Sequence, residues 1–146
     1  MPEPNIMELC YRLMNKYNQK TKNPKRYGTD DLLYASEVHM IEVIGTYERI
    51  TTTKLAECMG ITKGAVSQTT SKLLQKDLIL KTASRERSNE VFITLTAKGR
   101  KVLDGHHKIH EKMNERVNDV MVKMSEESKK DMIALFHAFD SSLDEI

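Results

Sequence analysis

The sequence is short of the features that mark secreted or membrane-spanning proteins. Its 146 residues include two cysteines, Cys10 and Cys58, whose spacing matches neither a disulfide framework nor a paired metal site, which favours a reducing cytoplasm. No apolar run approaches the roughly 20 residues that a helix needs to cross a bilayer, and the first residues lack the apolar core of a signal peptide. We therefore expect a cytoplasmic protein with no membrane partner.

The common signatures of catalysis are missing as well. The sequence has no glycine-rich phosphate loop, no His-Glu-x-x-His motif and no nucleophile set beside a base. We therefore expect no enzymatic activity. Hydrophobic residues make up 39% and charged residues 30% of the chain, which is ordinary for one compact globular domain.

The net charge is only +2, but the positive charge is concentrated in the middle of the chain. Residues 1–48 hold 6 Lys and Arg against 7 Asp and Glu, a net of −1. Residues 49–90 hold 8 against 4, a net of +4, and residues 91–146 hold 9 against 10, again −1. A basic segment between nearly neutral flanks is typical of a phosphate-contacting segment, although a chance excess on a solvated face gives the same numbers.

Hydrophobic periodicity predicts a mainly α fold with a small β-wing. The predicted helices cover residues 5–17, 36–44, 52–59, 62–76, 96–124 and 125–146. The expected N-caps are Asn5, Ser36, Thr51 or Thr52, Thr62, Thr96 and Ser125. Two short strands, at residues 78–80 and 91–95, are joined by a polar loop. The order of these elements predicts a winged helix-turn-helix with additional helices at both ends.

The segment from Lys54 to Gln68 has the helix, glycine-containing turn and second helix of a helix-turn-helix. The apolar side of its second helix packs on the first, which leaves a polar face free for base edges and phosphates in the major groove. The candidate DNA contacts on that helix are Thr62, Lys63, Gly64, Ser67, Gln68 and Lys72. Arg85 and Arg87, between the two strands, form a wing for the minor groove. A helical hairpin that serves only packing is the alternative.

In these segments the chain resembles the MarR family of winged-helix regulators. The resemblance is carried by Leu55-Ala56, Gly60-Ile61-Thr62, Gly64-Ala65-Val66-Ser67, Lys72-Leu73, Leu78-Ile79 and Leu95-Thr96-Ala97-Lys98-Gly99. It implies one domain over residues 1–146, in which helices at about 5–20 and 97–146 form a homodimer. Residues of about 36–95 then form the winged helix-turn-helix, and the protein represses transcription from a pseudo-palindromic double-stranded DNA operator. The family's wing usually carries Asp-x-Arg, whereas this chain has Arg85-Glu86-Arg87, so the resemblance does not fix the register of the wing arginine.

Histidine forms the second informative pattern. His106 and His110 stand four residues apart on the long helix, so both rings leave one face, a spacing that suits a shared metal ion. His39, on the second helix, has Glu37 and Glu42 near it as sources of an oxygen ligand. Such a set suits zinc best. The alternative is that these histidines are solvated or packed, with His106 bonded inside the core.

The resemblance favours the metal site. Zinc-dependent uptake repressors of the MarR family bind metal at the junction of the second and fifth helices, at positions that match His39, His106 and His110. Those repressors take a further ligand from the end of the first helix, where this chain has Lys20-Thr21-Lys22, so Glu37 is the expected substitute. His107 and His137 are expected at the surface.

Other signals stay open for a regulator of this type. The signal would then be a small organic ligand in a pocket beside the DNA-binding region, or oxidation of a cysteine, and not a metal. Either signal would release the protein from DNA. We expect Cys10 and Cys58 to be buried thiols, because Cys10 lies in an apolar stripe and Cys58 in the small third helix.

Overall fold

The computed structural model describes residue 3, residues 5–86 and residues 89–146. It divides into two compact units, residues 1–107 and residues 108–146. Helix α5 (Ala97–Met121) begins in the first unit and ends in the second. Among the described residues, no helix is both long and apolar enough to cross a membrane. The single domain expected for residues 1–146 stays a prediction.

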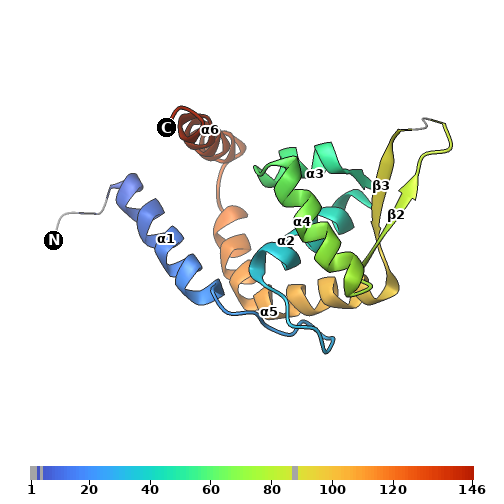
Figure 1. The fold of residues 1–146 in the computed structure, drawn as a ribbon. Helices are drawn as coiled ribbons and strands as arrows, with labels where there is room; N and C mark the ends of the chain where they lie inside the picture. Colours follow the sequence, from blue (N-terminus) through green and yellow to red (C-terminus); the bar gives the residue numbers. More distant parts are fainter. Residues whose placement is uncertain (1–2, 4, 87–88) are drawn as a thin grey trace. The chain divides into compact units, whose positions relative to one another are not determined.

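The first unit holds most of the secondary structure (Figure 1). Its elements in chain order, before α5, are α1 (Ile6–Thr21), α2 (Ala35–Tyr47), β1 (Ile50–Thr51), α3 (Thr52–Met59), α4 (Lys63–Gln75), β2 (Ile79–Ala83) and β3 (Val91–Leu95). The second unit consists of the end of α5 and of α6 (Glu126–Leu143). The prediction of a mainly α fold with a small β-wing is confirmed.

Side-chain caps explain where the helices begin. At α1, Asn5 accepts a hydrogen bond from the backbone N–H of Glu8 at 2.9 Å, and Glu8 accepts one from the backbone N–H of Asn5 at 3.3 Å. The Ser125 hydroxyl accepts from the Ser128 N–H at 3.1 Å at the start of α6. The polar residues expected as caps at these two helices therefore satisfy N–H groups that have no partner inside the helix.

Helix α2 begins two residues earlier than the sequence suggested. Its N-cap is Tyr34 rather than Ser36, and the Glu37 carboxylate accepts a hydrogen bond from the Tyr34 backbone N–H at 2.8 Å. The acid three residues after the cap thus satisfies the backbone N–H of the cap residue itself.

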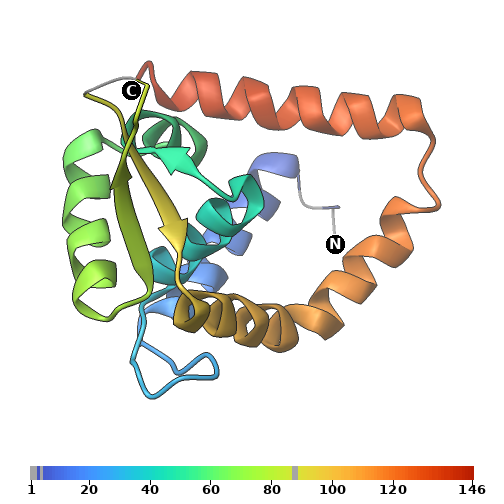
Figure 2. The same cartoon turned by 90° about the vertical axis from the view of Figure 1, so that its right-hand side faces the viewer.

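The sheet is antiparallel with strand order β1-β3-β2, and Figure 2 shows its three strands together. Strands β2 and β3 pair over their full length, from Ile79 opposite Leu95 to Ala83 opposite Val91. Strand β1 was not expected from the sequence. It is two residues long and exists because Ile50, which is buried, pairs with Ile93 of β3.

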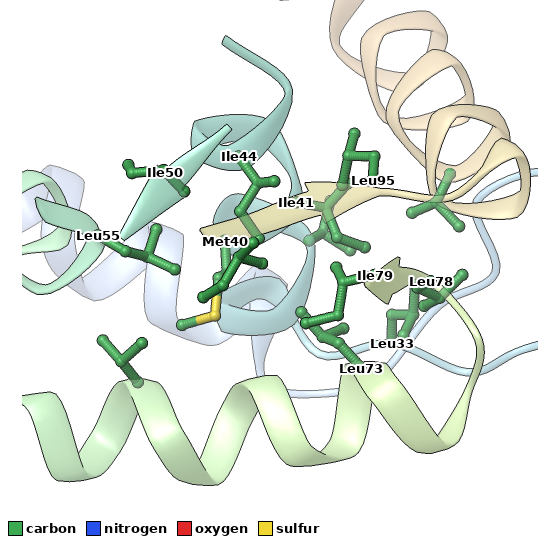
Figure 3. Close-up of a cluster of buried hydrophobic side chains, with 14 of the residues drawn as sticks. Leu33, Met40, Ile41, Ile44, Ile50, Leu55, Leu73, Leu78, Ile79 and Leu95 are labelled. Carbon is green, nitrogen blue, oxygen red and sulfur yellow. The ribbon is translucent and has the colours of Figure 1, made fainter. Parts of the chain in front are cut away.

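One hydrophobic core lies inside the first unit (Figure 3). Helix α2 contributes Met40, Ile41 and Ile44, α3 contributes Leu55, and α4 contributes Leu73, all fully buried. The other buried apolar residues are Tyr27, Leu33, Val38, Ile50, Ala56, Val66, Leu78, Ile79, Ile93, Leu95 and Val102. Because these residues come from the helix pair, the sheet and the start of α5, the core holds one side of α4 and leaves its other side to solvent.

Candidate functional site

The turn between α3 and α4 sets the direction of the second helix. Helix α3 ends at Met59, and its C-cap residue Gly60 adopts φ 63° and ψ 35°, a left-handed conformation that glycine takes without steric cost. Two residues later, the Thr62 hydroxyl accepts a hydrogen bond from the Ala65 backbone N–H at 3.1 Å and caps α4. A glycine stop followed by a threonine start thus produces the turn of a helix-turn-helix.

Helix α4 has one buried side and one polar side. Val66, Thr70 and Leu73 are buried, and the Thr70 hydroxyl is satisfied because it donates to the Ser67 carbonyl at 3.2 Å. All six residues predicted on this helix as DNA contacts are exposed: Thr62, Lys63, Gly64, Ser67, Gln68 and Lys72. Ser71, four residues after Ser67, is exposed as well and was not selected from the sequence, although its helical spacing was the available signal.

The wing follows α4 as the hairpin of β2 and β3 (Figure 1). At its far end the Ser84 backbone N–H donates to the Glu90 carbonyl at 2.7 Å, which extends the pairing beyond the strands. Arg85 lies in the connecting loop and is exposed. Arg87 lies outside the described residues, so its predicted role in the wing stays a prediction.

A second group of polar residues gathers where α2 meets the first turns of α5. The buried His106 ring places Nδ1 3.0 Å from Glu42 Oε2, and the exposed His107 places Nε2 3.5 Å from Glu42 Oε1. The three possible ligand atoms of Glu42, His106 and His107 all lie within 4.8 Å of one another. His39 stands beside them, with its ring centroid 5.5 Å from that of His106.

Two tyrosines border these histidines. The Tyr17 hydroxyl of α1 is hydrogen-bonded to His39, 3.2 Å from Nε2, and the Tyr27 ring meets His106 edge-on at 5.8 Å between centroids. Burial raises the pKa of both phenols, and the nearby Tyr17 raises the pKa of Tyr27 further. Both tyrosines are therefore neutral hydroxyls near pH 7, which can donate hydrogen bonds but add no charge.

Comparison with known proteins shows which family the helix-turn-helix and wing resemble. Residues 33–86, from just before α2 into the wing, match the model of the MarR family. The helix-turn-helix regulator PchR of Bacillus subtilis is 28% identical over 109 residues, which are 75% of this chain and 64% of that protein. The chain thus spans just under two thirds of the length of this relative. The winged helix-turn-helix of this chain thus resembles that of the MarR family.

Solved structures show the same fold. FabT of Streptococcus pneumoniae, determined in complex with DNA, aligns with a TM-score of 0.67 and 24% identity, over 97% of this chain and 99% of FabT. The zinc-responsive MarR family member ZitR of Lactococcus lactis aligns with a TM-score of 0.61 and 19% identity, over 95% of this chain and 99% of ZitR. PchR is described as a transcriptional regulator, and FabT and ZitR share the fold of this chain.

The structure differs from the sequence-based site in one acid. Glu37 was expected to supply the metal-binding carboxylate, but its oxygens are engaged elsewhere: Oε2 accepts from the Tyr34 backbone and Oε1 lies 2.8 Å from Lys76 Nζ. The side chain is only 4% exposed, so it cannot leave these partners without burying an unpaired charge. Glu42, which the sequence also offered, is the acid beside the histidines.

The remaining predictions concern the other histidines and the two cysteines. His107 and His137 are exposed, as expected. Cys58 is exposed rather than buried, because it lies on the side of α3 away from the core, where its thiol donates to the Tyr47 hydroxyl at 3.5 Å. Cys10 is partly buried. His110, one turn beyond His106 along α5, falls in the second unit and is half-buried, so its role as a ligand stays a prediction.

Proposed function

We propose that this protein is a DNA-binding transcriptional repressor of the MarR family, which acts as a homodimer on a pseudo-palindromic operator. A dimer would place its two α4 helices in successive major grooves, with half-sites about one helical turn apart. Thr62, Lys63, Ser67 and Gln68 read base edges and adjacent phosphates, while Lys72 and the wing arginines hold the backbone.

The exposed polar face of α4 is the observation that carries the proposal. The core fixes Val66 and Leu73 on the other side of the helix, so the polar face has a defined orientation within the first unit. Gly64, in the first turn, meets no atom closer than 3.8 Å where a side chain would begin, which leaves the helix N-terminus open to a phosphate. FabT, which shares the fold, was determined in complex with DNA.

Alanine substitutions on this face test the proposal. Lys63→Ala and Gln68→Ala are each expected to weaken binding to an operator duplex, and Gln68→Ala also to relax base preference at one position. Lys22→Ala and Gln19→Ala make the same changes at exposed positions outside the proposed interface and serve as controls. Equal affinity of all four variants and the unchanged protein would contradict the proposal.

The apolar ends of the chain support the homodimer. On α1, Ile6 is 55% and Leu13 65% exposed, and on α6, Phe136 is 59% exposed. Exposed apolar side chains in such numbers are typical of a surface that a partner covers. Light scattering on the purified protein should give twice the chain mass, and Leu13→Asp should lower it.

We also propose that a divalent metal, with zinc the first choice, controls the DNA affinity. The residues fit such an ion, because two imidazole nitrogens and a carboxylate oxygen are common zinc ligands and here lie within 4.8 Å of one another. His106 and Glu42 would hold it, with His39, His107 and the sequence-predicted His110 as further candidates. ZitR, which shares the fold, is zinc-responsive.

When bound, the metal supplies a link between α2 and α5. Glu42 lies on the helix that packs against α3, whereas His106 lies on α5. Ligands drawn from both helices favour the arrangement in which the two stay together. DNA affinity changes only as far as DNA binding also prefers that arrangement.

Zinc uptake by the chelator-stripped protein tests this part of the proposal. A chromophoric chelator in competition should report tight uptake by the unchanged protein, and uptake at least tenfold weaker in His106→Ala and Glu42→Gln. His137→Ala removes a surface histidine and Glu37→Ala removes the acid first expected as a ligand. Both variants should take up zinc as tightly as the unchanged protein. Unchanged uptake in His106→Ala, or uptake with no effect on DNA affinity, would contradict metal control and leave an organic or redox signal.

A further inference from the structure

An arginine outside the helix-turn-helix is held beside the wing by an unusual turn. Helix α2 ends at Tyr47, and its C-cap residue Glu48 adopts φ 59° and ψ −46°. The Arg49 backbone N–H donates to the Tyr47 carbonyl at 2.6 Å. These values describe a γ-turn with positive φ, which is rare and strained for a residue with a side chain. The turn leads the chain directly into β1 and places Arg49 at the sheet.

The side chain of Arg49 is oriented by an aromatic ring. Its guanidinium carbon lies 3.8 Å from the centroid of the Phe92 ring, on the central strand β3. Stacking leaves the five N–H donors of the guanidinium in their own plane, where they remain available to an acceptor. Arg49 is exposed at the surface, so the stack presents a cation and does not bury it.

The stacked pair borders a concavity of about 450 Å³ on the wing. Phe92 and Thr82 pair across β3 and β2, so their side chains share the same face of the sheet. The lining includes Arg49, Arg85, Thr82, Thr94, Phe92 and Glu86. The lining residues carry two guanidinium groups, the hydroxyls of Thr82, Ser84 and Thr94, and one carboxylate, which gives the concavity a net positive charge.

We propose that this concavity binds a phosphate of the DNA backbone and that Arg49 is its principal contact. The inference rests on the proposed function, because it extends the α4 interface along the wing. Planar guanidinium groups match phosphate geometry with paired hydrogen bonds, and hydroxyl groups are common secondary partners. The chain thereby gains a backbone contact that does not depend on the register of its wing arginines.

The salt dependence of DNA affinity tests the proposal. Each phosphate contact contributes about 0.9 to the slope of log affinity against log salt, so Arg49→Gln should lower the slope by about 1.8 in a dimer. Raising the salt from 50 to 200 mM should then lower the affinity of the unchanged protein about twelvefold more than that of the variant. The loss should be the same on operator and unrelated duplexes, because a phosphate contact carries no sequence information.

Three variants complete the design. Arg49→Lys keeps the charge and loses the planar stack, so it should retain the slope with a smaller loss of affinity. Glu86→Gln removes the opposing carboxylate and should raise the affinity. Arg116→Gln, at an exposed position of α5 in the second unit, is the matched control and should change neither the salt slope nor the DNA affinity.

The outcomes separate this inference from the proposed function. If Arg49→Gln and Arg116→Gln show the same salt dependence of DNA affinity, in a protein that binds DNA through α4, only the phosphate assignment is overturned. Saturable binding of inorganic phosphate by the protein without DNA, together with an unchanged slope, would assign the concavity to a free anion and overturn it as well. An unchanged protein with no salt-dependent DNA affinity would overturn the proposed function and this inference together.

Discussion

Replacing Gly105 with Ala would force helix α5 away from the backbone on which it rests. A Cβ atom at this position would lie 2.5 Å from both the carbonyl carbon and the carbonyl oxygen of Tyr27, and 3.1 Å from the Gly28 nitrogen. Ordinary contacts begin at 3.4 Å, so the two segments must separate by about 0.9 Å. The atoms in the way are backbone atoms, which cannot turn aside as a flexible side chain can.

The magnitude follows from comparison with a second glycine in an open position. Gly64 in α4 meets only the Thr62 hydroxyl oxygen, at 3.8 Å from the new Cβ. Both changes gain about 1 kcal/mol of helix propensity, whereas only Gly105→Ala suffers overpacking, which costs about 1–3 kcal/mol. The free energy of unfolding of Gly105→Ala should therefore be about 1–3 kcal/mol below that of Gly64→Ala.

Urea unfolding followed by helical circular dichroism measures this difference. Both variants must be compared at the same protein concentration, because dimer formation adds a concentration-dependent contribution to the apparent stability. Because His106 follows Gly105 directly, Gly105→Ala should also weaken zinc uptake, whereas Gly64→Ala should leave it unchanged. Equal unfolding free energies for the two variants would refute the packing of α5 against residues 27 and 28.

Three further changes test other parts of the first unit. Lys76→Met leaves the buried Glu37 carboxylate without its cation and should lower the free energy of unfolding by about 1–3 kcal/mol in urea titrations; no loss would contradict the ion pair. The hydrogen bond from Lys98 lowers the pKa of Asp31, so this group stabilises the fold at neutral pH, and its contribution is lost as the pH falls below about 4. Asp31→Asn should therefore be less stable at pH 7 and lose less stability on acidification, and parallel unfolding curves at pH 7 and pH 3 would refute this sign. Glu48→Gly relieves the positive φ and should raise the free energy of unfolding by up to about 1 kcal/mol, and the melting temperature with it. A lower melting temperature would show that the turn is not strained.

The helix-turn-helix was predictable because its signals are local. Gly60 and Thr62 determine the end of one helix and the start of the next through the backbone conformation and hydrogen bond of single residues. The apolar spacing of Val66 and Leu73 then determines which side of α4 is buried. Each of these signals acts within a few positions of the chain, so the sequence contains them in full.

The parts that the sequence missed depend on contacts between distant residues. Strand β1 is too short for any periodicity and forms only because Ile50 pairs with Ile93. Glu37 and Glu42 are equivalent acids near His39 in the sequence. The first is removed from the site by the Tyr34 backbone N–H and by Lys76, which lies 39 positions away. In the sequence Arg49 looks like one more surface cation, and only its contact with Phe92 of β3 gives it a fixed orientation.

Selection from a random-sequence duplex library tests the central claim most directly. The unchanged protein should enrich a pseudo-palindromic site with half-sites about one helical turn apart, and Gln68→Ala should change the preferred base at the same position in both half-sites. Enrichment of no sequence, or of the same sequence by the unchanged protein and by both Lys63→Ala and Gln68→Ala, would contradict the assignment of α4 as the DNA-reading helix.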